Sequence, residues 1–184
     1  MLSEILKRVD GYAPGRDVPL RGYGAAMATY AGLLGLVLFG VTRKPRRQPG
    51  AMDLALLGVG THKLSRIITK DFVTSPLRAP FTSRREVEGA GEVHDEPRGN
   101  GWQRSIGELL TCPYCAGPWL ATGLGALLTW RPAPTRFVLQ TLAAVTVSDF
   151  LHAAYARLHE SRKGVQAERQ RSERGAGADA ARPS

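Results

Sequence analysis

Two cysteines three positions apart, in the segment Cys112-Pro113-Tyr114-Cys115, have the clearest capacity for chemistry in this chain. Pro113 suits the first turn of a helix, where the N–H that proline lacks has no partner in any case. A thiol just before that turn faces the positive end of the helix, which favours the thiolate form. Cys112 is therefore a candidate nucleophile, and Cys115, one turn later, is a candidate to resolve a mixed disulfide.

Three interpretations of this cysteine pair stay open. The tetrapeptide is also the active-site motif of glutaredoxins, but no sheet pattern of that fold surrounds it. The spacing also matches half of a zinc knuckle, for which His62 or His152 could supply further ligands. The third interpretation is structural: two small, soft side chains pack the start of a helix in a reducing compartment. We predict no firm metal ligand set and no cofactor, with zinc as the alternative.

Ionisable side chains inside otherwise apolar segments form a second candidate group. They are His62, Arg66, Asp149 and His152. Charged groups at membrane depth are functional candidates by default, so a proton or ion path is one interpretation. We favour the simpler one, an Arg66–Asp149 ion pair that holds two helices together.

A third group lies in the polar stretch 70–111. Its acidic side chains are candidates for a divalent-cation site or an acid/base pair. The alternative is a solvated loop whose carboxylates are neutralised by arginines. The residues singled out here are Arg78, Glu92, Glu96 and Glu108. The short run Gly89-Ala90-Gly91 is too small a glycine motif to predict phosphate binding.

Long apolar segments must position these groups. Gly22–Val41 has twenty residues without a charge, enough to cross a bilayer at 1.5 Å per residue. Further helices are predicted at 51–69, 113–130 and 136–158, although the charged end of 51–69 also fits an interfacial helix. Gly24, Ala28 and Gly32 form a small-residue stripe that predicts close helix packing. We therefore predict an all-α fold: a small transmembrane bundle of three or four membrane helices with a cytoplasmic polar loop lobe.

The predicted organisation follows from these segments. Residues 1–21 form a surface segment, 22–41 an additional transmembrane helix, and 51–158 a membrane domain that contains the polar loop 70–111. Residues 159–184 are charged and lack aromatics, which predicts a disordered tail. Alternating helix directions bring the cysteines, Arg66 and His152 to the same membrane face.

The charge distribution predicts location and partners. The formal net charge is +9, and the basic residues flank apolar runs. This pattern favours anionic lipid and orientation by the positive-inside rule over nucleic acid, which we do not expect as a partner. The long loop and the tail are rich in lysine and arginine, so we predict a multi-pass protein with both in the cytoplasm.

Several short motifs, in order, resemble a bacterial family of small membrane proteins, the domain-of-unknown-function family numbered 1360. The resemblance extends over about Leu54–Leu158. Its motifs are HKLSR (His62–Arg66), PLRAPF (Pro76–Phe81), GAGEV (Gly89–Val93) and GELLTCPYC (Gly107–Cys115). It implies location in a bacterial cytoplasmic membrane and supplies no mechanism.

We accordingly expect a non-enzymatic membrane component or docking subunit. Its partners would be the lipid bilayer, a membrane or cytoplasmic protein, and further copies of the chain. The alternatives are a membrane dithiol oxidoreductase that uses Cys112 and Cys115, and a metal-binding membrane subunit.

Overall fold

The computed structural model describes residues 18–43, 48–88 and 92–180. The predictions for residues 1–17 and for Gly89-Ala90-Gly91 lie outside these ranges. The chain divides into two compact units, residues 1–143 and 144–184, each of which is described by itself. In order, the elements are α2 (Leu20–Thr42), α3 (Ala51–Lys70), η1 (Phe72–Thr74), α4 (Ser75–Arg78), β1 (Thr82–Glu88), β2 (Glu92–Pro97), α5 (Gly101–Thr111), α6 (Pro113–Trp130) and α7 (Pro132–Ala180).

The described part of the chain is mostly helical, as predicted, but fewer helices than predicted fit a membrane. By length and composition, two helices of the described residues could cross one: Leu20–Thr42 and Pro132–Lys163. The predicted count of three or four is corrected to two. Helix α3 carries Asp53, Lys63, Arg66 and Lys70, while α6 is uncharged but contains three glycines and two prolines, which lower its mean hydropathy.

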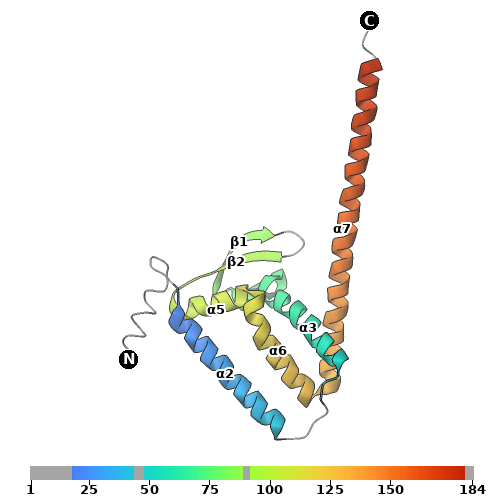
Figure 1. Cartoon of the computed structure of the whole chain (residues 1–184). Helices are drawn as coiled ribbons and strands as arrows, with labels where there is room; N and C mark the ends of the chain where they lie inside the picture. The colour runs from blue at the N-terminus through green and yellow to red at the C-terminus, as the bar shows by residue number, and fades with distance from the viewer. Residues whose placement is uncertain (1–17, 44–47, 89–91, 181–184) are drawn as a thin grey trace. The chain divides into compact units, whose positions relative to one another are not determined.

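Helices α2, α3 and α6 lie side by side in the first unit, with α5 across one end (Figure 1). The core is a cluster of leucines from α3, α6 and the start of α7. Leu124, Leu128 and Leu139 are buried, and Leu56, Leu57 and Leu64 pack against them. Gly60 of α3 allows α7 to approach closely, because a Cβ there would lie 2.6 Å from Leu139 Cδ2.

Helix α2 contacts the rest of the first unit at its amino end and through Tyr30. Gly22 lies directly against Ser105 of α5, whose hydroxyl donates to Pro19 O at 3.4 Å. Tyr30 meets Trp119 of α6 edge to face, with ring centroids 5.2 Å apart, and its hydroxyl lies 3.0 Å from Thr122 Oγ1. The predicted small-residue stripe does not take part, since a Cβ on Gly24 or Gly32 would meet nothing within 4 Å.

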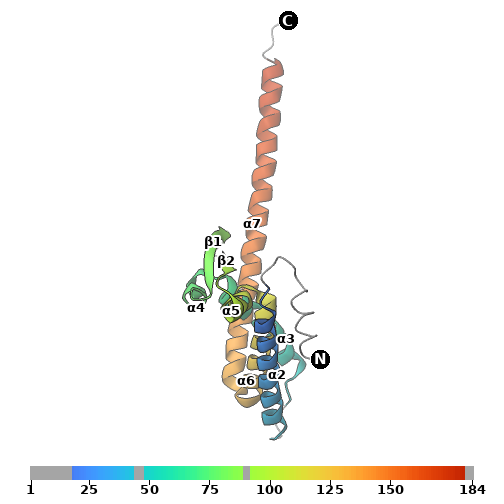
Figure 2. The same cartoon turned by 90° about the vertical axis from the view of Figure 1, so that its left-hand side faces the viewer.

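Residues 72–88 and 92–111, from η1 to the end of α5, form what we call the lobe. Both views place its hairpin and α5 at the end of α2 and α6 where those helices begin (Figures 1 and 2). The hairpin is antiparallel, with Thr82 opposite Pro97 and Glu88 opposite Glu92. Helix α5 packs on β2, α2 and α6, and thereby joins the hairpin to the helices.

Candidate functional site

The cysteine pair lies where α5 gives way to α6. Cys112 is the N-cap of α6, with an extended backbone, and Pro113 opens the helix. The Cys112 Sγ accepts a hydrogen bond from the Cys115 backbone N–H at 3.3 Å. Both thiols are free; Cys112 is half-buried and Cys115 is exposed. The sulfur of Cys112 therefore serves as a helix cap, a role usually taken by an oxygen.

A carboxylate of α5 links the amino end of α2 to the lobe. Glu108 accepts a hydrogen bond from the Tyr23 hydroxyl and another from Arg104 Nε, the latter at 3.2 Å. Glu108 is half-buried, so these donors compensate for the water that it loses. The sequence singled out Glu108 as an acidic loop residue, but it held no signal for Tyr23, which lies 85 positions away.

The most deeply buried charge of the lobe is Arg78. Its side chain is 0% exposed, and its Nε donates to Asp95 Oδ2 of β2 at 2.9 Å. Its terminal nitrogens also donate to Ile68 O at 2.7 Å and to Asp71 O at 3.0 Å. A single guanidinium thus joins the end of α3 to α4 and the hairpin, through one carboxylate and two backbone carbonyls.

Two other predicted acidic residues pair with arginines nearer the surface. Arg66 of α3 pairs with Glu92, with the two side chains 39% and 32% exposed. Arg85 Nε donates to Glu96 Oε2 at 2.7 Å, and both of these side chains are exposed. The charges of the hairpin thus bind one another and the end of α3. Surface pairs of this kind contribute little to stability.

The predicted cluster of ionisable groups is divided between the two units. His62 and Arg66 lie in the last turns of α3, where the His62 side chain is exposed. Asp149 and His152 lie on α7 in the second unit. The structure gives Arg66 the partner Glu92, and the Arg66–Asp149 pair stays a prediction. Within the described ranges, no three His, Cys, Asp or Glu side chains are grouped so that they could hold a metal ion.

An unpredicted ion pair lies at the opposite end of the first unit from the lobe. Asp53, in the first turn of α3, accepts from Arg136 of α7 through Nε and Nη2, both at 2.7 Å. Asp53 also accepts from the Gly50 N–H at 3.1 Å in a capping box. The Asp53 side chain is 10% exposed and that of Arg136 37%. The 83 positions between the two residues explain why the sequence gave no sign of the pair.

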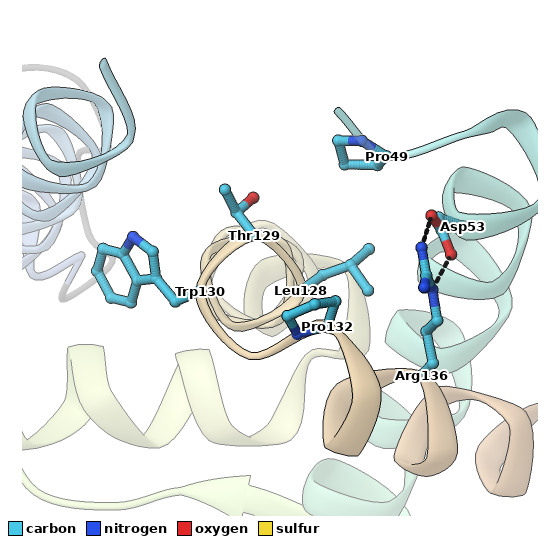
Figure 3. A pocket seen from close by; sticks show the side chains of 7 residues that line it. All are labelled: Pro49, Asp53, Leu128, Thr129, Trp130, Pro132 and Arg136. Carbon is cyan, nitrogen blue, oxygen red and sulfur yellow. Dashed lines mark hydrogen bonds and ion pairs between the residues drawn. The ribbon is translucent and has the colours of Figure 1, made fainter. Parts of the chain in front are cut away.

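This pair forms one wall of a pocket of about 350 Å³. Figure 3 shows the Asp53–Arg136 pair on one side of the end of α6 and the Trp130 side chain on the other side of that helix. The lining residues are Pro49, Asp53, Leu128, Thr129, Trp130, Pro132 and Arg136. The first unit therefore has two polar regions, the lobe with the cysteines at one end and this pocket at the other.

Comparison with known proteins places the chain in a family. A family model described as "Protein of unknown function (DUF1360)" matches residues 56–155. The chain is 26% identical to "Sporulation protein YjcA" of Bacillus subtilis (strain 168) over 109 residues, which cover 58% of this chain and 92% of that protein. It is 28% identical to "UPF0713 protein YngL" of the same organism over 121 residues, covering 62% and 89%. No solved structure matches. Since the family model covers more than half of the chain, this protein belongs to the DUF1360 family.

Proposed function

We propose that this protein is an integral membrane protein that acts as a non-enzymatic component, with the lobe as the surface on which a protein partner docks. The observation that carries the proposal is the exposure of α2. None of its 23 residues is buried. Met27 is 73% exposed, Leu36 68% and Phe39 54%. Removing each such side chain from water is worth about 1.5–3 kcal/mol, so this surface favours lipid.

The positions of the charged residues in the first unit are compatible with a bilayer around α2. The uncharged stretch of α2 starts at Gly22, next to the lobe, and ends before Arg43. The charged side chains Lys63, Arg66 and Lys70 of α3 come late in the helix, toward the lobe. We place α2 across the membrane, with α6 packed on α2 and α3 packed on α6, and the lobe in the cytoplasm, as the positive-inside rule favours.

Exposed apolar side chains on the lobe support a docking role. Val73 is 82% exposed, Leu77 63% and Trp102 68%, although the lobe is otherwise highly charged. Val73 and Leu77 are four positions apart, and exposed apolar side chains on an otherwise polar surface favour an interaction site. One relative is named for sporulation and not for a reaction, which agrees with a component better than with an enzyme.

Alkaline extraction and site-specific photo-crosslinking test the two parts of the proposal. Washing membranes with carbonate should leave the full chain in the pellet; release into the supernatant would contradict the membrane placement. A photoreactive residue at Val73 or Leu77 should give a defined protein adduct in cells, while one at Phe137, 72% exposed on α7, should not. Equal adducts at all three positions would contradict docking on the lobe.

A dithiol oxidoreductase is the second candidate, and it rests on the short separation of the two cysteines. The Cys112 sulfur accepts a hydrogen bond from the Cys115 N–H at the start of α6. Cys115 is exposed and one turn away. In this reading Cys112 attacks a substrate disulfide, a mixed disulfide forms, and Cys115 then displaces the substrate thiol while the protein pair is oxidised to a disulfide.

A further inference from the structure

We propose that the pocket beside Arg136 binds a phosphate group, with the phosphodiester of a membrane lipid as its source. This inference rests on the proposed membrane placement. The pocket of about 350 Å³ has room for a lipid headgroup, and its lining includes Arg136, Thr129 and two prolines. Nothing in the lobe or the cysteine pair takes part in it.

The hydrogen bonding of Arg136 leaves one edge of its guanidinium for a ligand. Nε and Nη2 both donate to Asp53. Among the described residues, the hydrogen bonds of the Arg136 side chain do not use Nη1, and this side chain is 37% exposed on the pocket wall. Asp53 holds the guanidinium in one orientation, so little side-chain entropy is lost when an anion binds the outer edge. A phosphate oxygen is a suitable acceptor for such N–H groups.

The negative charge of Asp53 repels an anion in the pocket less than an unpaired carboxylate would. Its two oxygens accept from Arg136 and from the Gly50 N–H at the start of α3, and its side chain is 10% exposed. Arg43 and Arg131, both exposed, follow the last residues of α2 and α6 at this same end. The net charge of Asp53, Arg136, Arg43 and Arg131 together is therefore positive.

The depth of the pocket matches the phosphate layer of a bilayer. The pocket lies where α6 ends at Trp130 and α7 begins at Pro132. Trp130 is 42% exposed, and tryptophan prefers the boundary between headgroups and acyl chains. Nearby apolar side chains, Leu127 at 48% exposure and Phe137 at 72%, offer surface to the acyl chains of the same lipid. This apolar surface favours a lipid over free phosphate.

The test measures lipid retention by native mass spectrometry and the melting temperature of the full-length protein in mild detergent. The probes are phosphatidylglycerol and, in a separate arm, inorganic phosphate. Arg136→Lys keeps the charge opposite Asp53 but removes the outer N–H groups, and should weaken phosphatidylglycerol binding at least fivefold. Arg131→Lys, the same change at a neighbouring arginine outside the pocket lining, should change it less than twofold.

A second variant keeps the test informative if Arg136→Lys does not fold. Thr129→Phe fills the pocket without removing any atom of the ion pair, and should abolish retention while the melting temperature without lipid is kept. A response to inorganic phosphate with none to phosphatidylglycerol would overturn the lipid assignment. Equal retention by wild type, Arg136→Lys and Thr129→Phe would overturn the site. Neither result bears on carbonate extraction, which tests the membrane placement separately.

Discussion

The guanidinium of Arg78 and the carboxylate of Asp95 form an ion pair shut off from solvent, with side chains 0% and 5% exposed. The same guanidinium donates to the Ile68 and Asp71 carbonyls at the end of α3. This buried side chain is thus one of the links that hold the hairpin against the end of α3. Because burial of the pair is costly in itself, its loss should show in the shape of the lobe as much as in overall stability.

Replacing Arg78 with methionine should lower the free energy of unfolding by about 3–5 kcal/mol, the usual effect of leaving one member of a buried pair without its partner. Urea titration of the protein in detergent micelles measures it. The control is Arg85→Met, which breaks the exposed Arg85–Glu96 pair and should stay within about 0.5 kcal/mol of wild type. Similar losses for both variants would contradict the central place of Arg78.

Changing Gly22 to alanine should loosen the docking of α2 on α5. A Cβ at Gly22 would overlap the Ser105 side chain, whereas one at Gly24 would meet nothing within 4 Å. We expect Gly22→Ala to cost about 1–3 kcal/mol, as overpacking of a close contact does. Gly24→Ala changes the same helix with the same gain in helix propensity and should cost nothing. Unfolding of both variants in one detergent makes the comparison, and equal stability would mean that α2 does not pack here.

Charge exchange can identify the partner of Arg66. Arg66→Glu alone should weaken the attachment of the hairpin to α3, because it places two acids together. Adding Glu92→Arg should restore the wild-type melting temperature, since the observed pair is rebuilt in reverse. If Arg66 instead pairs with Asp149, as the sequence predicts, then adding Asp149→Arg to Arg66→Glu should restore the melting temperature. The size of either effect is small, on the order of 0.5–1 kcal/mol, because Arg66 and Glu92 are each about a third exposed.

The thiols separate the two candidate functions. In a docking component, Cys112 should react with an alkylating reagent no faster than an ordinary free thiol. Cys115 should react more slowly, because burial and the neighbouring Cys112 raise its pKa to about 11, and Cys115→Ser should leave activity in the cell intact. In an oxidoreductase, Cys112→Ser abolishes function and Cys115→Ser traps a mixed disulfide visible on a non-reducing gel. A trapped adduct would therefore replace our first proposal with the second.

Local sequence patterns were sufficient for α2, α3, α6 and the first part of α7. A run without charge, such as Gly22–Val41, can only be buried or placed in lipid, and proline after Cys112 marks the start of α6. The hairpin was not predicted, because β1 reads Thr-Ser-Arg-Arg-Glu-Val-Glu and lacks alternating apolar residues. Its strands are set by contacts with α5 and by the buried Asp95, neither of which a local pattern reveals.

The long-range pairs mark the limit of a single sequence. Tyr23 and Glu108, or Asp53 and Arg136, lie more than eighty positions apart, and only packing brings them together. The small-residue stripe of α2 is a local pattern that predicted a contact absent from the described residues. Its spacing suggested a packing face, but the glycine in close contact with α5 is Gly22, which lies outside the stripe.

Labelling of engineered cysteines across an intact membrane tests the central claim most directly. In a chain with Cys112→Ser and Cys115→Ser, one variant carries Arg21→Cys at the start of α2, next to the lobe, and another Gln48→Cys beyond the far end of α2; both positions are exposed. The account predicts that a membrane-impermeant thiol reagent added to intact, uniformly oriented vesicles labels only one of the two, and labels both once the vesicles are opened. Labelling of both in intact vesicles would contradict a membrane-crossing α2.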